Sequence, residues 1–160
     1  MTRLFTILLA ASLLGCTPYQ AAPADRQQAN PQTTAPQQTT PVQTEANTVT
    51  IEVGDQTFSM ILADTEAAQD FAARLPLTLD MQELNGNEKY SNLDEALPTE
   101  ASAPGQIETG DCMLYGDRCV VLFYEDFSTS YRYTPLGKIQ DSTGLAQAVG
   151  SGAVTVTFTN

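Results

Sequence analysis

The chain contains no histidine and no tryptophan, and its 160 residues include only seven lysines and arginines against 19 acidic residues. Without histidine, neither a Ser-His-Asp triad nor a Cys-His pair can be built in the usual form. The commonest transition-metal ligand is also missing. No glycine-rich phosphate loop precedes an expected helix, so a nucleotide site is unsupported. We therefore expect no metal and no cofactor.

The negative charge of the chain is concentrated in residues 48–160, which limits the kinds of partner that this part can bind. Residues 1–47 balance Arg3 and Arg26 against Asp25 and Glu45, so residues 48–160 carry the whole net charge of −12. A field of this sign repels phosphate backbones and anionic lipid surfaces. We expect no nucleic-acid partner.

The apolar run near the amino end is short. Leu4 to Leu14 follows Arg3 and is interrupted only by Thr6 and Ser12. As a helix, the run would span about 16 Å, roughly half of a bilayer's hydrocarbon core. It is therefore typical of a signal peptide rather than of a membrane-spanning helix.

The run ends in Leu13-Leu14-Gly15-Cys16, which resembles the lipobox of bacterial lipoproteins. The resemblance implies that residues 1–15 are removed and that Cys16 carries acyl chains, which hold the protein to the lipid bilayer. An ordinary secretory signal with a chance cysteine is the alternative. Thr17 stands where Asp commonly retains Gram-negative lipoproteins in the inner membrane. The protein is thus expected in the cell envelope, at the outer membrane facing the periplasm if the cell has two membranes.

Residues 16–47 form a segment rich in proline, glutamine and threonine with no apolar periodicity. Such a segment cannot bury enough surface to offset the entropy of ordering. We interpret it as a disordered tether that spans roughly 30 Å on average, either as a functional spacer or as an unselected one.

Residues 48–160 have the size of one domain. Alternating apolar residues predict strands at 48–53, 56–62, 77–81, 113–115, 119–124, 130–133 and 154–158, with a hairpin turn at Gly54-Asp55. Asp64 and Asp141 are expected to cap two short helices, which end at Pro76 and Gly150, and 93–105 is a polar loop. About eight strands predict a mainly β fold, a closed barrel without free edges. A two-sheet sandwich is the alternative.

Four groups of residues stand in one order along this domain: LPLTLDM at 75–81, LNGNEKY at 84–90, GD with LYG at 110–116, and FSTSY at 127–131. They resemble a bacterial family of cyclophilin-like domains over most of residues 49–159. The resemblance implies a closed eight-stranded barrel with helices over its open ends, in agreement with the alternation. Family members are often small exported or lipid-anchored proteins of undefined function.

The resemblance raises the question of peptidyl-prolyl isomerisation. Cyclophilins use an arginine in a Phe-His-Arg-type strand, and no such string occurs here. Arg74 is expected at a helix end and Arg118 beside a turn, which leaves Arg132 as the one candidate. We therefore predict a non-catalytic binding or interaction module, with no catalytic residue assigned. An isomerase with a non-standard site is the alternative, and an accessory partner of an envelope redox or assembly system is a third reading.

Two polar strings are candidates for a ligand pocket at a barrel mouth. Their expected ligand-binding residues are Asn85, Asn87, Lys89, Tyr90, Ser128, Thr129, Ser130 and Arg132. Amide and hydroxyl groups orient a ligand by hydrogen bonds without reacting with it. The ligand would be an unidentified peptide, protein or small molecule. The alternative is a tight turn and a strand whose hydroxyls bond the backbone.

Other acidic and sulfur groups have plainer interpretations. The carboxylate pairs Glu125-Asp126, Asp94-Glu95 and Asp80 with Glu83 are expected to be solvated surface charge rather than an acid–base or Ca²⁺ site. If Tyr115 pairs with Arg118, Cys112 and Cys119 share a face diagonally at about 7–8 Å, which is long for a disulfide. We expect a disulfide if a bulge or twist closes that gap, and two buried thiols otherwise.

Overall fold

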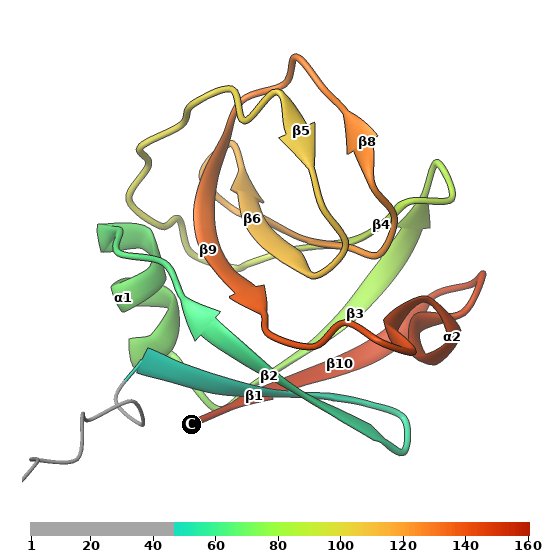
Figure 1. Cartoon of the computed structure of the whole chain (residues 1–160). Helices are drawn as coiled ribbons and strands as arrows, with labels where there is room; N and C mark the ends of the chain where they lie inside the picture. Colours follow the sequence, from blue (N-terminus) through green and yellow to red (C-terminus); the bar gives the residue numbers. More distant parts are fainter. Residues whose placement is uncertain (1–46) are drawn as a thin grey trace, which may run out of the picture. The chain divides into compact units, whose positions relative to one another are not determined.

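Eight antiparallel strands close into a barrel, and this confirms the predicted mainly β fold (Figure 1). The structure, a computed structural model, describes residues 47–160. The predicted signal peptide, the acylated Cys16 and all but the last residue of the predicted tether lie outside the described residues. The order round the barrel is β1-β10-β3-β4-β7-β6-β9-β2.

The elements are short, as the alternation predicted. The barrel strands are β1 (Thr48–Val53), β2 (Gln56–Leu62), β3 (Leu77–Leu84), β4 (Glu88–Asn92), β6 (Asp111–Tyr115), β7 (Cys119–Phe123), β9 (Tyr133–Ile139) and β10 (Val154–Thr159). A separate two-stranded sheet pairs β5 (Gln106–Ile107) with β8 (Phe127–Ser128). The two helices, α1 (Glu66–Ala73) and α2 (Leu145–Val149), lie on opposite sides of the barrel in Figure 1.

The caps of both helices differ from the prediction. The N-cap of α1 is Thr65, whose Oγ1 accepts a hydrogen bond from the Ala68 amide at 3.1 Å. Asp64 lies one residue too early for this role. Asp141 instead accepts a hydrogen bond from the Thr143 amide, and α2 begins after Gly144 without a side-chain cap. Gly150 ends α2 as expected, with a φ of 59° that suits glycine.

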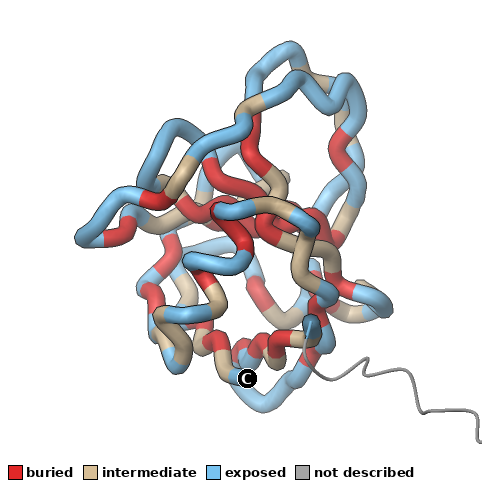
Figure 2. The backbone as a smooth tube through the Cα atoms, turned by 90° about the vertical axis from the view of Figure 1, so that its left-hand side faces the viewer, coloured by how far each residue is buried: buried red, intermediate tan, exposed pale blue. Residues whose placement is uncertain are grey.

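Two hydrophobic clusters use the two faces of the barrel wall. Along β7, Val120 and Leu122 belong to the main core inside the barrel, whereas Val121 and Phe123 belong to a second cluster on the outer face. Ile107, Met113 and Tyr133 complete the buried part of this outer cluster. Figure 2 shows short buried stretches that alternate with exposed ones along the backbone, and the outermost bends of the tube are mostly exposed. A wall that is apolar on both sides allows the outer face to carry a site.

The chain from residue 84 to residue 133 holds most of the differences from the prediction. Strand β4 was not predicted, and residues 130–132 are irregular because β9 begins only at Tyr133. The register places Tyr115 opposite Cys119 rather than opposite Arg118. This shift of one residue turns Cys112 and Cys119 to opposite faces of the wall, and both are free. The possible disulfide is therefore not formed.

Within residues 47–160, no helix is both long and apolar enough to cross a membrane.

Candidate functional site

A pocket of about 600 Å³ lies on the outer face of the barrel wall. Its lining consists of Leu84, Asn85, Asn87, Glu88, Tyr90, Tyr115, Cys119, Val121, Phe127, Ser128, Thr129, Ser130, Tyr131 and Tyr133. The sequence predicted such a pocket at a barrel mouth. The structure places it instead on the outer face of the wall. Val121 and Tyr133 belong to the outer cluster and not to the main core, so the pocket is separate from the barrel interior.

Strand alternation decides which residues form the floor of the pocket. Glu88 pairs with Phe123, and Tyr90 pairs with Val121, so these four side chains share the outer face of β4 and β7. Lys89, between Glu88 and Tyr90, must then point into the barrel. Alternation along β4 therefore places Glu88 and Tyr90, but not Lys89, beside the pocket.

The residues from Phe127 to Tyr131 cover one side of the pocket. Ser128 Oγ donates to Gln106 Oε1 at 2.9 Å, and the Thr129 amide donates to the Gly105 carbonyl at 3.0 Å. Thr129 Oγ1 in turn accepts from the Tyr131 amide at 3.1 Å. The Thr129 hydroxyl therefore bonds the backbone, as the alternative interpretation proposed. The same segment nevertheless lines the pocket.

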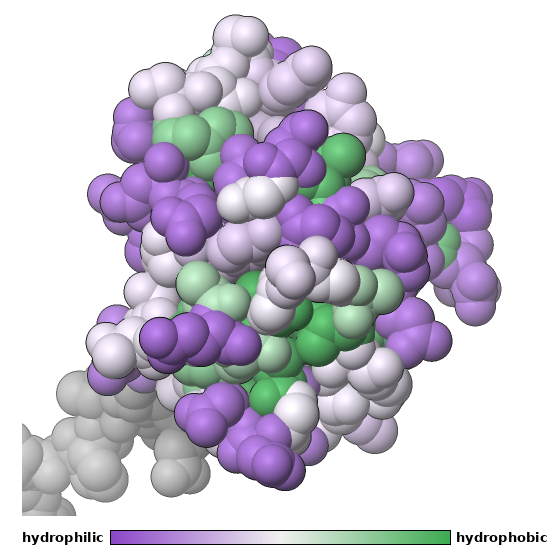
Figure 3. All heavy atoms as spheres, turned by 90° about the vertical axis from the view of Figure 1, so that its right-hand side faces the viewer, coloured by the Kyte–Doolittle hydropathy of each residue, from purple (hydrophilic) through white to green (hydrophobic). Residues whose placement is uncertain are grey.

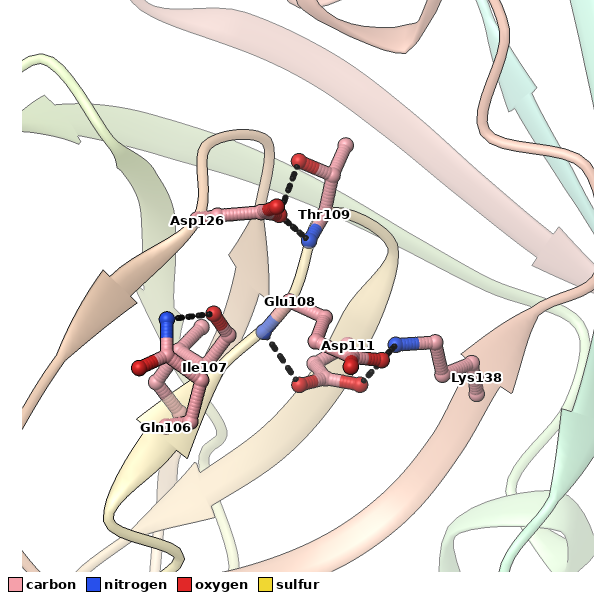
Figure 4. Close-up of polar contacts among 7 residues, drawn as sticks. All are labelled: Gln106, Ile107, Glu108, Thr109, Asp111, Asp126 and Lys138. Atoms are coloured by element: carbon pink, nitrogen blue, oxygen red, sulfur yellow. Dashed lines mark hydrogen bonds and ion pairs between the residues drawn. The ribbon is translucent and has the colours of Figure 1, made fainter.

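A polar network fixes the chain that carries this segment (Figure 4). Asp126 Oδ1 accepts from the Thr109 amide at 2.6 Å and from Thr109 Oγ1 at 2.8 Å. These bonds lower the pKa of Asp126 below its ordinary value. Lys138 Nζ donates to Asp111 Oδ1 at 2.8 Å and to Glu108 Oε2 at 2.7 Å. Burial lowers the pKa of Lys138, but these two partners outweigh it and raise the pKa overall. The network joins the end of β5 to the start of β8 and to β9.

Aromatic rings form a continuous wall of the pocket. Tyr115 lies 6.0 Å from Tyr131 and 5.6 Å from Tyr133 between ring centroids. Phe123, which is fully buried and is not part of the lining, lies 5.5 Å from Tyr133 and 5.6 Å from Phe127 between ring centroids. Edge-to-face and tilted pairs at these distances are favourable. These ring contacts therefore stabilise the aromatic wall.

Glu88 is the acidic residue of the lining, and it is half-buried. In the described part of the chain, no cation or hydrogen-bond donor contacts its carboxylate. Burial raises the pKa of Glu88, and the negative charge of Glu83 raises it further. The charge of Glu88 also helps to raise the pKa of Cys119, after burial. The carboxylate therefore faces the pocket without a counter-ion.

The turn between β3 and β4 carries the other polar residues of the lining. Asn85 and Gly86 adopt φ values of 59° and 73°, a conformation that Asn and Gly tolerate best. Asn87 Oδ1 is buried and has no hydrogen-bond partner. An unpaired buried acceptor costs about 1–3 kcal/mol, so the structure pays this cost beside the pocket.

Lys89 was expected in the ligand site but serves the core instead. It is fully buried, pairs with Glu83, and donates to the carbonyls of Gly150 and Gly152 at 2.8 and 2.7 Å. Burial would raise the pKa of Glu83, but hydrogen bonds from Lys89, Tyr124 and the Gly86 amide lower it. Lys89 therefore ties β4 to β3 and to the loop after α2.

The described arginines all lie outside the pocket lining. Arg132, which was also expected in the ligand site, lies outside the lining and donates to the Ala101 carbonyl. Arg118 donates to the Asp94 carbonyl, and Arg74 donates to the carbonyls of Glu95 and Ala96. Each guanidinium thus holds a loop. None lies where it could stabilise a twisted amide in the pocket.

Six of the eight predicted residues meet at the pocket: Asn85, Asn87, Tyr90, Ser128, Thr129 and Ser130. The prediction omitted the other eight residues of the lining, which are Leu84, Glu88, Tyr115, Cys119, Val121, Phe127, Tyr131 and Tyr133. A strand at 88–92 would have revealed Glu88, because residues 88 and 90 share a face whereas residue 89 does not. Tyr115, Cys119 and Tyr133 come from three different strands, and only the barrel register brings them together.

The acidic pairs remain surface or structural groups. Asp126 and Glu83 have the partners given above, and Asp80 Oδ1 accepts from Thr155 Oγ1 at 2.7 Å. Among residues 47–160, no group of three or more His, Cys, Asp or Glu residues is arranged to hold a metal ion. Cys112 is fully buried, and burial raises its pKa to about 12, so its thiol is inert.

Comparison with known protein families gives a match over most of the described residues. A family model described as the cyclophilin-like family matches residues 51–159, which include every strand that forms the pocket. No curated protein and no solved structure matches the chain significantly.

Proposed function

We propose that this chain, which belongs to the cyclophilin-like family, is a non-catalytic binding module held to a membrane of the cell envelope by lipid on Cys16. The observation that carries the binding role is the outer-face pocket. Its lining combines tyrosine and phenylalanine rings with amide and hydroxyl groups. Such a lining can hold and orient a ligand, and it lacks a paired nucleophile and base.

The location rests on the sequence. The short apolar run and the Leu13-Leu14-Gly15-Cys16 string support acylation of Cys16 in a bacterium. With two or three acyl chains, at about 0.8 kcal/mol for each buried CH₂ group, the anchor would be firm. Thr17 favours an outer-membrane position facing the periplasm if the cell has two membranes.

The surface supports a pocket rather than a flat interface. The large hydrophobic side chains exposed in residues 47–160 are Ile61, Leu84, Tyr115 and Tyr131, and all but Ile61 line the pocket. On the face drawn in Figure 3, hydrophilic side chains divide the apolar surface into separate areas. A partner that needs a broad apolar patch finds little to bind there.

A protease-coupled isomerisation assay on a short Xaa-Pro peptide tests the non-catalytic part of the proposal. The full-length protein in detergent is compared with Arg132→Ala and Arg118→Ala. We expect no rate above background, because the uncatalysed barrier is about 18–20 kcal/mol and one positioned donor is worth about 3–4 kcal/mol. No described arginine supplies that donor. A clear rate that disappears in either variant would show an isomerase.

A further inference from the structure

We infer that the outer-face pocket selects a small organic cation, an alkylated ammonium group, with Glu88 as its counter-ion and tyrosine rings as its walls. This inference rests on the proposed binding function, because it names the ligand class of the same pocket.

The first argument is the uncompensated charge of Glu88. Its carboxylate is half-buried, lines the pocket and has no donor or cation among residues 47–160. The neighbouring cation, Lys89, is committed to Glu83 on the other face of β4. A partly desolvated carboxylate without a partner is unfavourable. A cation that enters the pocket offsets this cost.

The second argument is the aromatic wall that faces the same space. Tyr131 is 62% exposed and Tyr115 is 47% exposed, although both rings lie in the pocket lining. Their rings and that of Tyr133 stand within 6.0 Å of one another in a chain of contacts. The negative face of such rings attracts a cation within about 6 Å of the centroid. Exposed tyrosines beside an unpaired carboxylate suit an alkylated ammonium group.

The third argument excludes other ligand classes. An anion would meet Glu88 and no lysine or arginine in the lining. A metal ion such as Ca²⁺ needs six to eight oxygen ligands, and no carboxylate cluster is present in the described residues. A neutral ring could fill the apolar part but would leave Glu88 without a counter-ion. The hydroxyls of Thr129 and Ser130 can still bind a polar group attached to the cation.

A matched pair of probes tests the charge separately from the shape. Choline and 3,3-dimethylbutan-1-ol differ only in the central atom of the bulky group, which is a cationic nitrogen in one and a neutral carbon in the other. Binding to the full-length protein in a non-ionic detergent is followed by NMR titration. We expect choline to bind about tenfold more tightly than the alcohol, and Glu88→Gln to remove most of that difference.

Two further variants show whether the preference for choline depends on the pocket. Glu52→Gln removes an exposed acid on β1 and should leave both affinities unchanged, while Tyr131→Ala should weaken choline several-fold. Equal affinity for the two probes, no binding of choline, or a preference that survives Glu88→Gln would overturn the cation inference. If the alcohol still shifts pocket resonances, the binding function stands. A trimethyl-lysine peptide that binds far more tightly than choline would show that the cation belongs to a protein, against the small-molecule ligand.

Discussion

At residue 88 a carboxylate lines a pocket without a counter-ion, whereas at residue 89 an ammonium is fully buried and fully paired. The two residues are adjacent in one strand, so alternation alone sends them to opposite faces. From the sequence alone, Lys89 was expected to bind the ligand and Glu88 was not. Its burial against Glu83, Gly150 and Gly152 shows why composition could not assign its role.

Replacing Lys89 should therefore damage stability rather than binding. Lys89→Met keeps most of the side-chain volume but leaves Glu83 and two carbonyls without their donor, and we expect a loss of about 3 kcal/mol in the free energy of unfolding. Lys138→Met is the matched control, because Lys138 is 43% exposed and its ion pairs are worth about 1 kcal/mol or less. Urea denaturation measures both. Equal losses in the two variants would contradict this account.

Glu88→Gln should raise the melting temperature at pH 7. The folded state raises the pKa of Glu88 above its ordinary value of 4.5, so folding favours the protonated form. The ionised carboxylate therefore costs stability at neutral pH, and this cost disappears as the pH falls below the pKa of the unfolded chain. The titratable groups near Glu88 are Glu83, Cys119, Tyr124 and Tyr133, and Glu88→Gln leaves all four in place.

Thermal melts at pH 7 and at about pH 3.5 check the sign. The advantage of Glu88→Gln should be present at pH 7 and absent at the lower pH. An advantage that persists at low pH, or a variant less stable than the wild type at pH 7, would show that Glu88 has a stabilising partner.

At the scale of elements, the pocket depends on a segment outside the barrel. The residues from Phe127 to Tyr131 are joined to the wall through β5, the Thr129–Gly105 bond and the bonds of Asp126 to Thr109. Asp126 looked like half of a surface carboxylate pair in the sequence. Its position explains why this short irregular segment stays beside the pocket.

Asp126→Ala should loosen that segment. Removing the acceptor of two Thr109 hydrogen bonds releases the start of β8, and we expect the Thr129 amide to exchange hydrogen about fivefold faster. Asp141→Ala is the control, because it removes a similar local bond to Thr143 far along the chain from β8. Hydrogen-exchange NMR measures single amides. Unchanged exchange at Thr129 would show that β8 is held by other contacts.

The local pattern predicted some elements well and others poorly for physical reasons. Period-two alternation around Gly54-Asp55 and through β10 fixed three strands almost to the residue. Strand β4 was not predicted because its inward residue is Lys89. A charged residue at an inward position interrupts the expected alternation of apolar and polar residues. The register of β6 and β7 also differed by one residue, which moved the two cysteines to opposite faces. A local sequence pattern does not show which distant strands pair with each other. Most of the pocket depends on such pairings and could not be predicted.

For the whole molecule, the negative charge of the barrel bears on how the protein is expected to be held to a membrane. A net charge of −12 should keep residues 48–160 from adhering to anionic lipid, so the proposed attachment to the membrane would depend on Cys16. We expect the wild type in the membrane fraction of its host and Cys16→Ala in the soluble fraction. Cys119→Ala, which leaves the lipobox intact, should stay with the membrane. Equal membrane retention of the wild type and Cys16→Ala would contradict lipid anchoring.

The central claim is that the outer face of the barrel holds a ligand pocket. The most direct measurement is an NMR screen of the full-length protein, labelled with ¹⁵N, against a library of small cations, neutral rings and short peptides. The account predicts that binders shift the amides of Tyr90, Cys119 and Thr129 together, because these residues line one space. Binders that shift only residues on other faces, or a library in which no compound shifts these three amides, would contradict it.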